Sequence, residues 1–123
     1  MAFTENDKPS LHEIATRFFQ KKDFEVQENV TLLGESGKKH KIELIAKIEA
    51  DVQINKIAIK ILDWKRSVGV DRLIRFERIL NDLNGMKGMM ISNAFSTSAK
   101  NFAKRRGIVL YSRKNLLLLL EEK

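Results

Sequence analysis

The 123-residue sequence contains no cysteine and only two histidines, His12 and His40. A chain without cysteine forms no disulfide, and it has neither a thiolate nucleophile nor a cysteine-based zinc site. Two widely separated histidines are too few to suggest a zinc site of another kind. The composition therefore excludes thiol chemistry and gives no sign of a zinc centre.

Long apolar segments are also missing. The leucine run Leu116–Leu120 has five residues, whereas a helix that spans a bilayer needs about 20. The amino terminus has no apolar stretch typical of a signal peptide. We therefore expect no membrane partner and a cytoplasmic location. Because five consecutive leucines surround a helix on every side, some of them are expected to contact another element or a second chain.

Positive charge, by contrast, is abundant. Lysine and arginine number 23 against 16 acidic residues, which gives a net charge of +7 and a pI near 9.8. Such an excess favours a polyanionic partner, most often nucleic acid. Apolar residues make up 43% of the chain, enough for a hydrophobic core. We expect one domain over residues 1–123, with residues 1–8 flexible.

Hydrophobic periodicity and turn residues divide the chain into alternating elements. Helices are expected from Ser10, where Ser10 and Glu13 form a capping box, from Val70 to Asn84-Gly85, from Ser96 or Thr97 to Gly107, and from Ser112 onward. Strands are expected at residues 24–32, 40–48, 57–62, 88–92 and 108–111. The order is α-β-β-β-α-β-α-β-α, an α/β fold whose central mixed sheet has about five strands flanked by helices.

The second and third strands are both apolar, and the third is rich in β-branched residues. They are expected to pair as an antiparallel hairpin, joined by a polar connection over residues 49–53 that turns near Asp51-Val52. Alternation would place Ile42, Leu44, Ala46 and Ile48 on one face of the second strand. In this register Glu43 lies about opposite Lys60, so the two side chains are expected to form an ion pair.

Three stretches carry a resemblance to a known family: Gly37-Lys-Lys-His-Lys-Ile-Glu-Leu-Ile-Ala, Ile59-Lys-Ile-Leu-Asp-Trp-Lys-Arg-Ser-Val-Gly, and the segment from Gly88 to Leu110. Together they resemble the Mrr-type restriction endonuclease domain and the archaeal Holliday-junction resolvase, both of the PD-(D/E)xK superfamily. The resemblance covers roughly residues 11–118 and implies the restriction-endonuclease-like fold. It also implies a DNA substrate and, in active members, carboxylates that hold Mg²⁺ or Mn²⁺ beside a lysine.

Two placements of the catalytic motif compete. In the first, Asp63-Trp64-Lys65 is the family's acid-x-Lys, and Glu43 and Glu13 complete a catalytic set in which Glu43 and Asp63 are the metal ligands. In the second, which we favour, residues 63–69 match the words that follow the catalytic lysine in relatives. The motif then falls on Lys60-Ile61-Leu62, where the acid has become lysine and the lysine has become leucine. This second placement predicts weak or absent cleavage and no metal cofactor.

The resemblance also indicates which basic residues face DNA: Lys38, Lys39, Lys41, Lys65 and Arg66. A further group, Arg72, Arg75 and Arg78, shares one side of the helix that begins at Val70. Each of these charges has a plainer explanation as part of a solvated face. Glu13 likewise fits a capping residue, Asp63 a loop start, and Trp64 a side chain that packs a loop onto the core.

Three functions remain open at this point. The first is a DNA-binding relative of the nucleases with a degenerate catalytic site. The second is an active Mg²⁺-dependent DNA endonuclease that uses Glu43, Asp63 and Lys65. The third is a protein-interaction module that keeps the fold for its surfaces. Relatives often pair, so we expect a homodimer, with a protein partner as a further possibility.

Overall fold

The structure is a computed structural model that describes residues 9–50 and 53–121. Residues 1–8, which we expected to be flexible, and residues 51–52, where we expected the hairpin turn, lie outside this range. The elements follow the predicted order: α1 (Leu11–Lys21), β1 (Glu25–Leu33), β2 (Lys39–Ala50), β3 (Gln53–Leu62), α2 (Val70–Asp82), β4 (Lys87–Ser92), α3 (Thr97–Arg106), β5 (Val109–Ser112) and α4 (Arg113–Glu121). The predicted fold class is confirmed.

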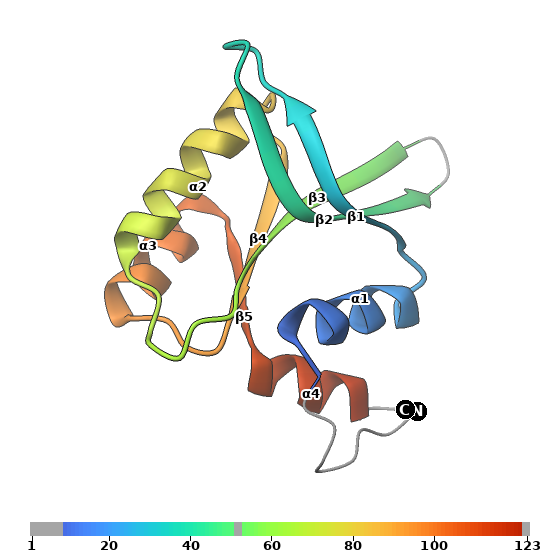
Figure 1. The fold of residues 1–123 in the computed structure, drawn as a ribbon, viewed down its shortest axis with the longest axis vertical. Coiled ribbons are helices and arrows are strands. Elements are labelled where there is room, and N and C mark those ends of the chain that lie inside the picture. The colour runs from blue at the N-terminus through green and yellow to red at the C-terminus, as the bar shows by residue number, and fades with distance from the viewer. Residues whose placement is uncertain (1–8, 51–52, 122–123) are drawn as a thin grey trace.

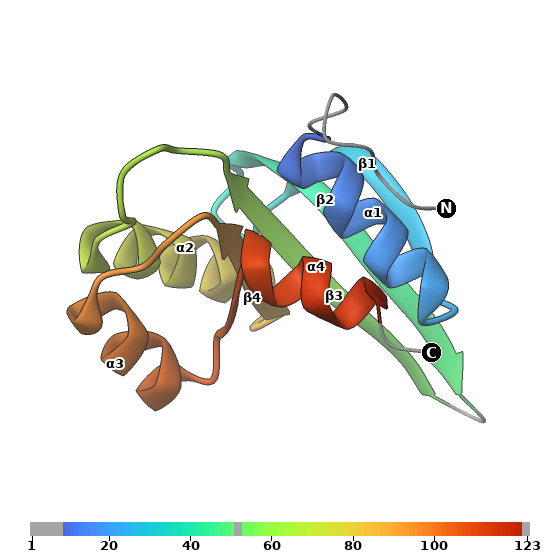
Figure 2. The ribbon, with the colours of Figure 1, turned by 90° about the horizontal axis from the view of Figure 1, so that it is seen from below.

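The strands form one mixed sheet in the order β1-β2-β3-β4-β5. The pairs β1–β2 and β2–β3 are antiparallel, whereas α2 and α3 serve as crossovers that make β3–β4 and β4–β5 parallel. Helices α2 and α3 cover one face of the sheet, and α1 and α4 cover the other (Figures 1 and 2). The result is a three-layer arrangement with a separate hydrophobic cluster on each side of the sheet.

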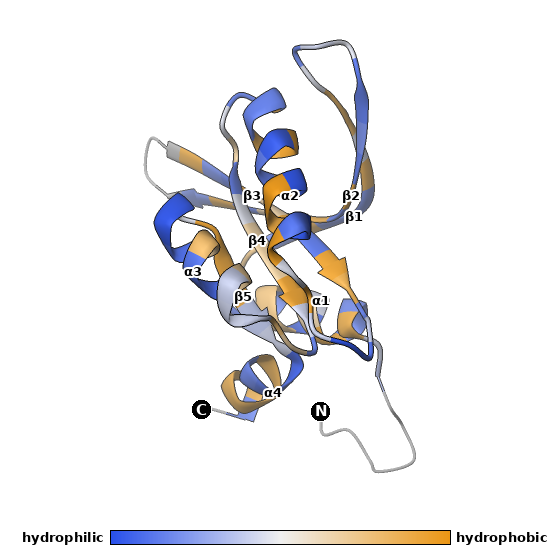
Figure 3. Cartoon of the chain, turned by 90° about the vertical axis from the view of Figure 1, so that its left-hand side faces the viewer, coloured by the Kyte–Doolittle hydropathy of each residue, from blue (hydrophilic) through white to orange (hydrophobic). Residues whose placement is uncertain are grey.

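The helix ends use the residues that the sequence offered. Ser10 and Ser96 accept hydrogen bonds from the backbone N–H of Glu13 and Ala99, as N-cap residues do. Gly107 ends α3 with φ of 71°, a left-handed conformation that glycine adopts without steric cost. Hydrophilic residues colour most of α3, while α2 alternates between apolar and polar positions (Figure 3). These caps confirm the predicted start of α1 and both predicted ends of α3.

The β2–β3 hairpin is longer than expected. Pairing continues through Glu49 with Ile54 and Ala50 with Gln53, so most of the segment that we expected to be a polar connection belongs to the strands. Polar residues fit there because this end of the hairpin projects beyond the helices (Figure 1). The pairing leaves only residues 51–52 to connect the two strands.

Strand β2 bends at Glu43. Leu44 and Ala46 belong to the cluster beneath α1, but Ile42 belongs to the cluster beneath α2, so the prediction of one shared face is wrong for Ile42. The β2–β3 pairing stops at Leu44 with Ile59. In β1, Asn29 lies opposite Glu43 and has φ of 51°, which interrupts the regular alternation. From this point the β1–β2 hairpin leaves the sheet as an arm (Figure 1).

Candidate functional site

Glu43 stands where the arm leaves β3, and it contacts the strand in two ways. Its Oε2 lies 3.4 Å from the Lys60 Nζ, and its Oε1 accepts a hydrogen bond of 2.8 Å from the Ile61 backbone N–H. Both side chains are partly buried, which strengthens their attraction relative to an exposed pair. The predicted ion pair between Glu43 and Lys60 is therefore confirmed.

The end of β3 bears on the two motif placements. The strand ends at Leu62, so Lys60-Ile61-Leu62 lies on β3 and Asp63-Trp64-Lys65 lies in the following loop. Residues two apart project to the same side only on a strand. Lys60 and Leu62 do share a side, since both line the pocket beneath α2. Residues 60–62 therefore have the strand geometry that an acid-x-Lys motif requires, whereas residues 63–65 lie in a loop.

Asp63 takes part in a network of a different kind. Its carboxylate accepts hydrogen bonds from the Arg113 guanidinium at 3.1 and 3.3 Å, the Asn93 amide at 2.9 Å, and the Leu11 N–H at 3.4 Å. Burial alone would raise the pKa of Asp63, but the hydrogen bonds from Asn93, Leu11 and Arg113, with the Arg113 charge, lower it below its usual value. The carboxylate is therefore held ionised by its protein donors.

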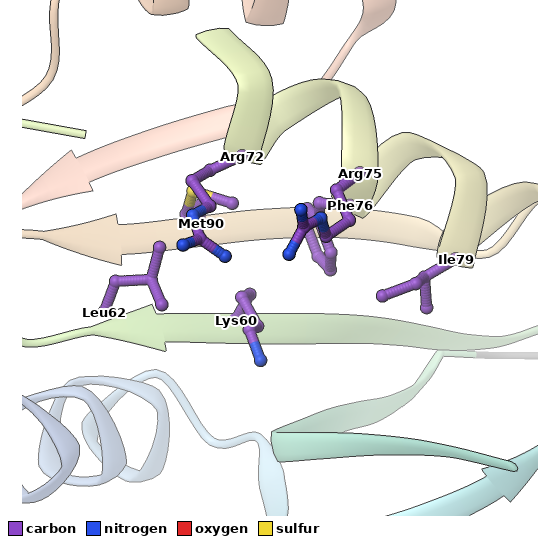
Figure 4. A pocket seen from close by; sticks show the side chains of 7 residues that line it. All are labelled: Lys60, Leu62, Arg72, Arg75, Phe76, Ile79 and Met90. Atoms are coloured by element: carbon purple, nitrogen blue, oxygen red, sulfur yellow. The ribbon is translucent and has the colours of Figure 1, made fainter. Parts of the chain in front are cut away.

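The side chains of Lys60 and Leu62 line a pocket of about 170 Å³ between β3, β4 and α2. Arg72 and Arg75 reach from α2 toward the strand that carries Lys60 (Figure 4). The remaining lining is apolar and consists of Phe76, Ile79 and Met90. This pocket brings Lys60 and Leu62 together with Arg72 and Arg75, two arginines that were not among the residues predicted to contact DNA. The sequence signal that could have identified these arginines is their spacing of three residues on the helix that follows β3.

The arm is fastened to the carboxyl end of α2 through Asp82. The Asp82 carboxylate accepts hydrogen bonds from the Ser36 N–H at 2.9 Å and hydroxyl at 2.7 Å, and contacts His40 Nε2 at 2.7 Å. The hydrogen bonds from His40 and Ser36 lower the pKa of Asp82 to about 2. A side chain at Gly34 would overlap this carboxylate, so a larger residue there would displace Asp82 from its partners. Ser36 and His40 both bind the Asp82 carboxylate, and Ser36 donates to Asp82 and not to His40. We therefore interpret the cluster as an anchor that holds the arm against α2.

The predicted DNA-contacting residues fall into two exposed groups. Lys38, Lys39 and Lys41 lie on the arm near the carboxyl end of α2, while Lys65 and Arg66 lie in the loop that leads to its amino end. Helix α2 has 13 residues, which corresponds to about 20 Å. The Arg66 and Arg72 guanidinium groups each lie 4.9 Å from the centre of the Trp64 ring. Trp64 itself packs against the core, so it joins the loop to α2.

The carboxylates around β3 do not fit a magnesium site as they stand. Magnesium requires free oxygen ligands, but Glu43 is paired with Lys60 and Asp63 with Arg113. Glu13 is exposed on the first turn of α1. Over residues 9–50 and 53–121 no three acidic or histidine side chains gather in a way that suits a metal. The catalytic assignment of Glu13, Glu43, Asp63 and Lys65 stays a prediction.

A family model described as "Restriction endonuclease" (Mrr_cat) matches residues 3–120. The chain belongs to this family. A search of curated proteins finds no match. The restriction-endonuclease resemblance inferred from the three sequence stretches is thus confirmed.

Solved structures support the same fold. A protein of unknown function, AF1548, aligns with 24% identity and a TM-score of 0.71 over 89% of this chain and 63% of that one. The MspJI restriction endonuclease in complex with a 27-mer oligonucleotide aligns with 17% identity and a TM-score of 0.57 over 89% and 26%. A repair endonuclease from Pyrococcus abyssi aligns with 15% identity and a TM-score of 0.54 over 89% and 49%. This restriction-endonuclease domain therefore spans less than two thirds of each.

A helix that crosses a bilayer needs about 20 predominantly apolar residues. Within the part of the chain that the structure describes, no helix is long and apolar enough to cross a membrane. Leu116 of the leucine run is fully buried in the cluster beneath α1, while Leu118 is exposed. The leucine run therefore contributes to the core of this domain. Contact with another element was one of the two expectations for this run, and contact with a second chain was the other.

Proposed function

We propose that this restriction-endonuclease domain binds DNA and that its catalytic site is degenerate, so that it cleaves weakly or not at all. The observation that carries the proposal is the contact between Lys60 and Glu43 at the point where the arm leaves β3. An ammonium group in this position repels a divalent cation and occupies the carboxylate that would bind it. Leu62, at the position of the family's lysine, offers no charge to a reacting phosphate.

Binding to DNA is supported by the placement of the basic residues. The group on the arm and the group in the loop after β3 lie toward opposite ends of α2, a helix of 13 residues and about 20 Å. A length of about 20 Å corresponds to about six base pairs of duplex. No sequence-reading motif was found in the chain, so binding should follow the phosphate backbone and depend strongly on salt. A relative with this fold, MspJI, was solved with an oligonucleotide bound.

The decisive experiment measures binding and cleavage side by side. Plasmid, linear duplex, single-stranded and four-way-junction DNA are incubated with Mg²⁺ or Mn²⁺, and gel shifts are run in EDTA. We expect binding without cleavage on every substrate. Cleavage that disappears in Glu43→Ala, Asp63→Ala and Lys65→Ala would instead establish the active endonuclease. Melting curves for each variant separate loss of a catalytic group from loss of folding.

Restoring the motif tests the favoured placement directly. The double variant Lys60→Glu, Leu62→Lys recreates an acid-x-Lys sequence on β3, with Glu43 nearby as a second carboxylate. If the degenerate motif lies at residues 60–62, the double variant gains Mg²⁺-dependent cleavage and each single variant stays inactive. If the double variant is folded and binds DNA but remains inactive in both metals, the site has lost more than these two side chains.

The expected homodimer and the expected protein partner belong to the same proposal. Sedimentation with and without DNA tests whether two copies of the domain assemble on one duplex. An absence of DNA binding at physiological salt would favour the protein-interaction module over both nuclease-derived functions.

A further inference from the structure

The pocket beneath α2 combines positive charge with apolar walls. Lys60, Arg72 and Arg75 supply the charge, and Phe76, Ile79, Met90 and Leu62 supply the walls. Cations at a water-accessible surface gain little from an anion because water screens them, whereas apolar walls reduce that screening. The composition of this pocket therefore suits a small anion better than a neutral or cationic ligand.

The arginines of the pocket are weakly engaged by the protein. Arg75 forms no ion pair or hydrogen bond with any residue in the described ranges, and the contact of Arg72 with the exposed Asp71 is 4.0 Å long. Arg72 is positioned chiefly by the face of the Trp64 ring. Glu43 compensates Lys60 alone, so two guanidinium groups remain available to an incoming ligand.

We infer that the former catalytic pocket binds a phosphate group directly, with Arg72 and Arg75 as its main donors and Lys60 at its edge. The inference rests on the proposed DNA binding, because it takes the phosphate to belong to a DNA strand. In an active relative a metal ion would bridge carboxylates and phosphate; here the cationic side chains themselves replace that bridge. Guanidinium groups suit this use, because each presents parallel N–H donors that match phosphate oxygens.

The central test compares two arginines on the same helix. Arg75→Gln removes a pocket donor, and Arg78→Gln removes an equal charge one turn further along. Both arginines are exposed, but Arg78 does not line the pocket. Loss of one charged hydrogen-bonding contact should weaken DNA binding about tenfold and reduce the slope of log K against log salt by about one. Arg78→Gln should change the affinity by no more than about twofold, as expected for an exposed charge that does not line the pocket and donates no hydrogen bond to a phosphate bound there.

A variant with an effect of the opposite sign sharpens the test. Glu43→Gln removes the charge that compensates Lys60, while the new amide oxygen can still accept from the Ile61 N–H. A phosphate-binding pocket then becomes more positive, and DNA binding tightens several-fold. In a metal-dependent site the same change would remove a ligand and abolish Mg²⁺-stimulated binding. The sign of the effect therefore decides between the two sites.

The source of the phosphate is resolved with three probes. Oligonucleotides with a 5′-phosphate and a 5′-hydroxyl, and inorganic pyrophosphate alone, are titrated while the Arg75 side-chain resonances are followed by NMR. Preference for the 5′-phosphate identifies a strand end, equal binding identifies an internal phosphodiester, and binding of pyrophosphate with no DNA binding identifies a free anion. The last outcome would overturn the proposed function and retain the phosphate site.

Two results would overturn the inference itself. One is equal weakening of DNA binding by Arg75→Gln and Arg78→Gln, which would leave the proposed DNA binding intact without the pocket. The other is the absence of any response of Arg75 to all three probes in a folded protein. Arg72 is left unchanged in these tests, because its contact with Trp64 would mix a folding effect with a binding effect.

Discussion

Two carboxylates flank the end of β3, and each is paired with one cation, yet their surroundings differ. Asp63 is the more exposed, at 44% against 24% for Glu43, but it has the larger number of donors. Its network joins the start of α1, the end of β4 and the start of α4. Among the residues that the structure describes, the Glu43 carboxylate has polar contacts with β3 alone, its neighbouring strand.

This comparison separates two uses of the same chemical pair. Arg113 also donates to the Pro9 carbonyl at 2.8 Å and to the Asn93 side chain at 2.8 Å, so the Asp63–Arg113 pair connects segments distant in the sequence. The Glu43–Lys60 pair connects nothing that the β2–β3 hairpin does not already hold. We therefore expect the first pair to stabilise the fold and the second to set the charge of the pocket.

The largest effect is expected from Arg113→Ala. The substitution removes the charged donor of Asp63 and the donor of the Pro9 carbonyl, and we expect a loss of about 2 kcal/mol in the free energy of unfolding. Urea denaturation measures it. Asp63→Ala should cost a similar amount and add little to Arg113→Ala, since both remove one network. Arg113→Lys is the matched control; full stability in that variant would show that charge alone suffices.

A second effect concerns the third carboxylate, Asp82, which anchors the arm. Because its pKa is lowered from 3.8 to about 2, the stability that its charge contributes is fully present above about pH 4 and is lost as the pH falls toward 2. Asp82→Asn should flatten the dependence of unfolding free energy on pH in this window. The control is Asp71→Asn, at an exposed position on the same helix. If both variants give the wild-type curve, the anchor contributes nothing to stability.

The smallest effect on stability is expected from Lys60→Met. The methionine keeps the length of the aliphatic stem, and the Ile61 N–H still binds Glu43. Partly exposed ion pairs contribute about 0 to 1 kcal/mol, so the free energy of unfolding should change by less than about 1 kcal/mol. Denaturation of Lys60→Met beside Arg113→Ala measures the contrast. A loss equal to that of Arg113→Ala would contradict the assignment of separate uses.

Local signals in the sequence were enough to predict the fold. Caps at Ser10 and Ser96, the glycine at Gly107 and the hydrophobic periods each depend on residues close in the chain, and the structure confirms them. The Glu43–Lys60 contact was also predictable, because the turn that we expected near residues 51–52 sets the register of the hairpin, and the pairing of Leu44 with Ile59 agrees with that register.

Contacts between distant segments could not be predicted in the same way. Arg113 meets Pro9 across 104 positions and Asp63 across 50, and nothing near Arg113 in the sequence indicates those partners. The switch of Ile42 to the other face depends on the left-handed conformation of Asn29 on a neighbouring strand. Arg72 and Arg75 were seen as a charged helix side, but their position over β3 depends on the loop that Trp64 packs against the core.

The packing of α1 against α4 has a consequence for how the chain folds. Leu11, Ile14 and Phe18 share their cluster with residues of the sheet and with Leu116 of α4, so the apolar face of the first helix is covered completely only when α4 is present. During synthesis the α2 side can assemble from consecutive segments, while the opposite side waits for residues near 121 to leave the ribosome. Contacts of such high sequence separation slow folding. Until α4 has been synthesised, part of the apolar face of α1 stays uncovered, and in that interval the chain is more open to aggregation.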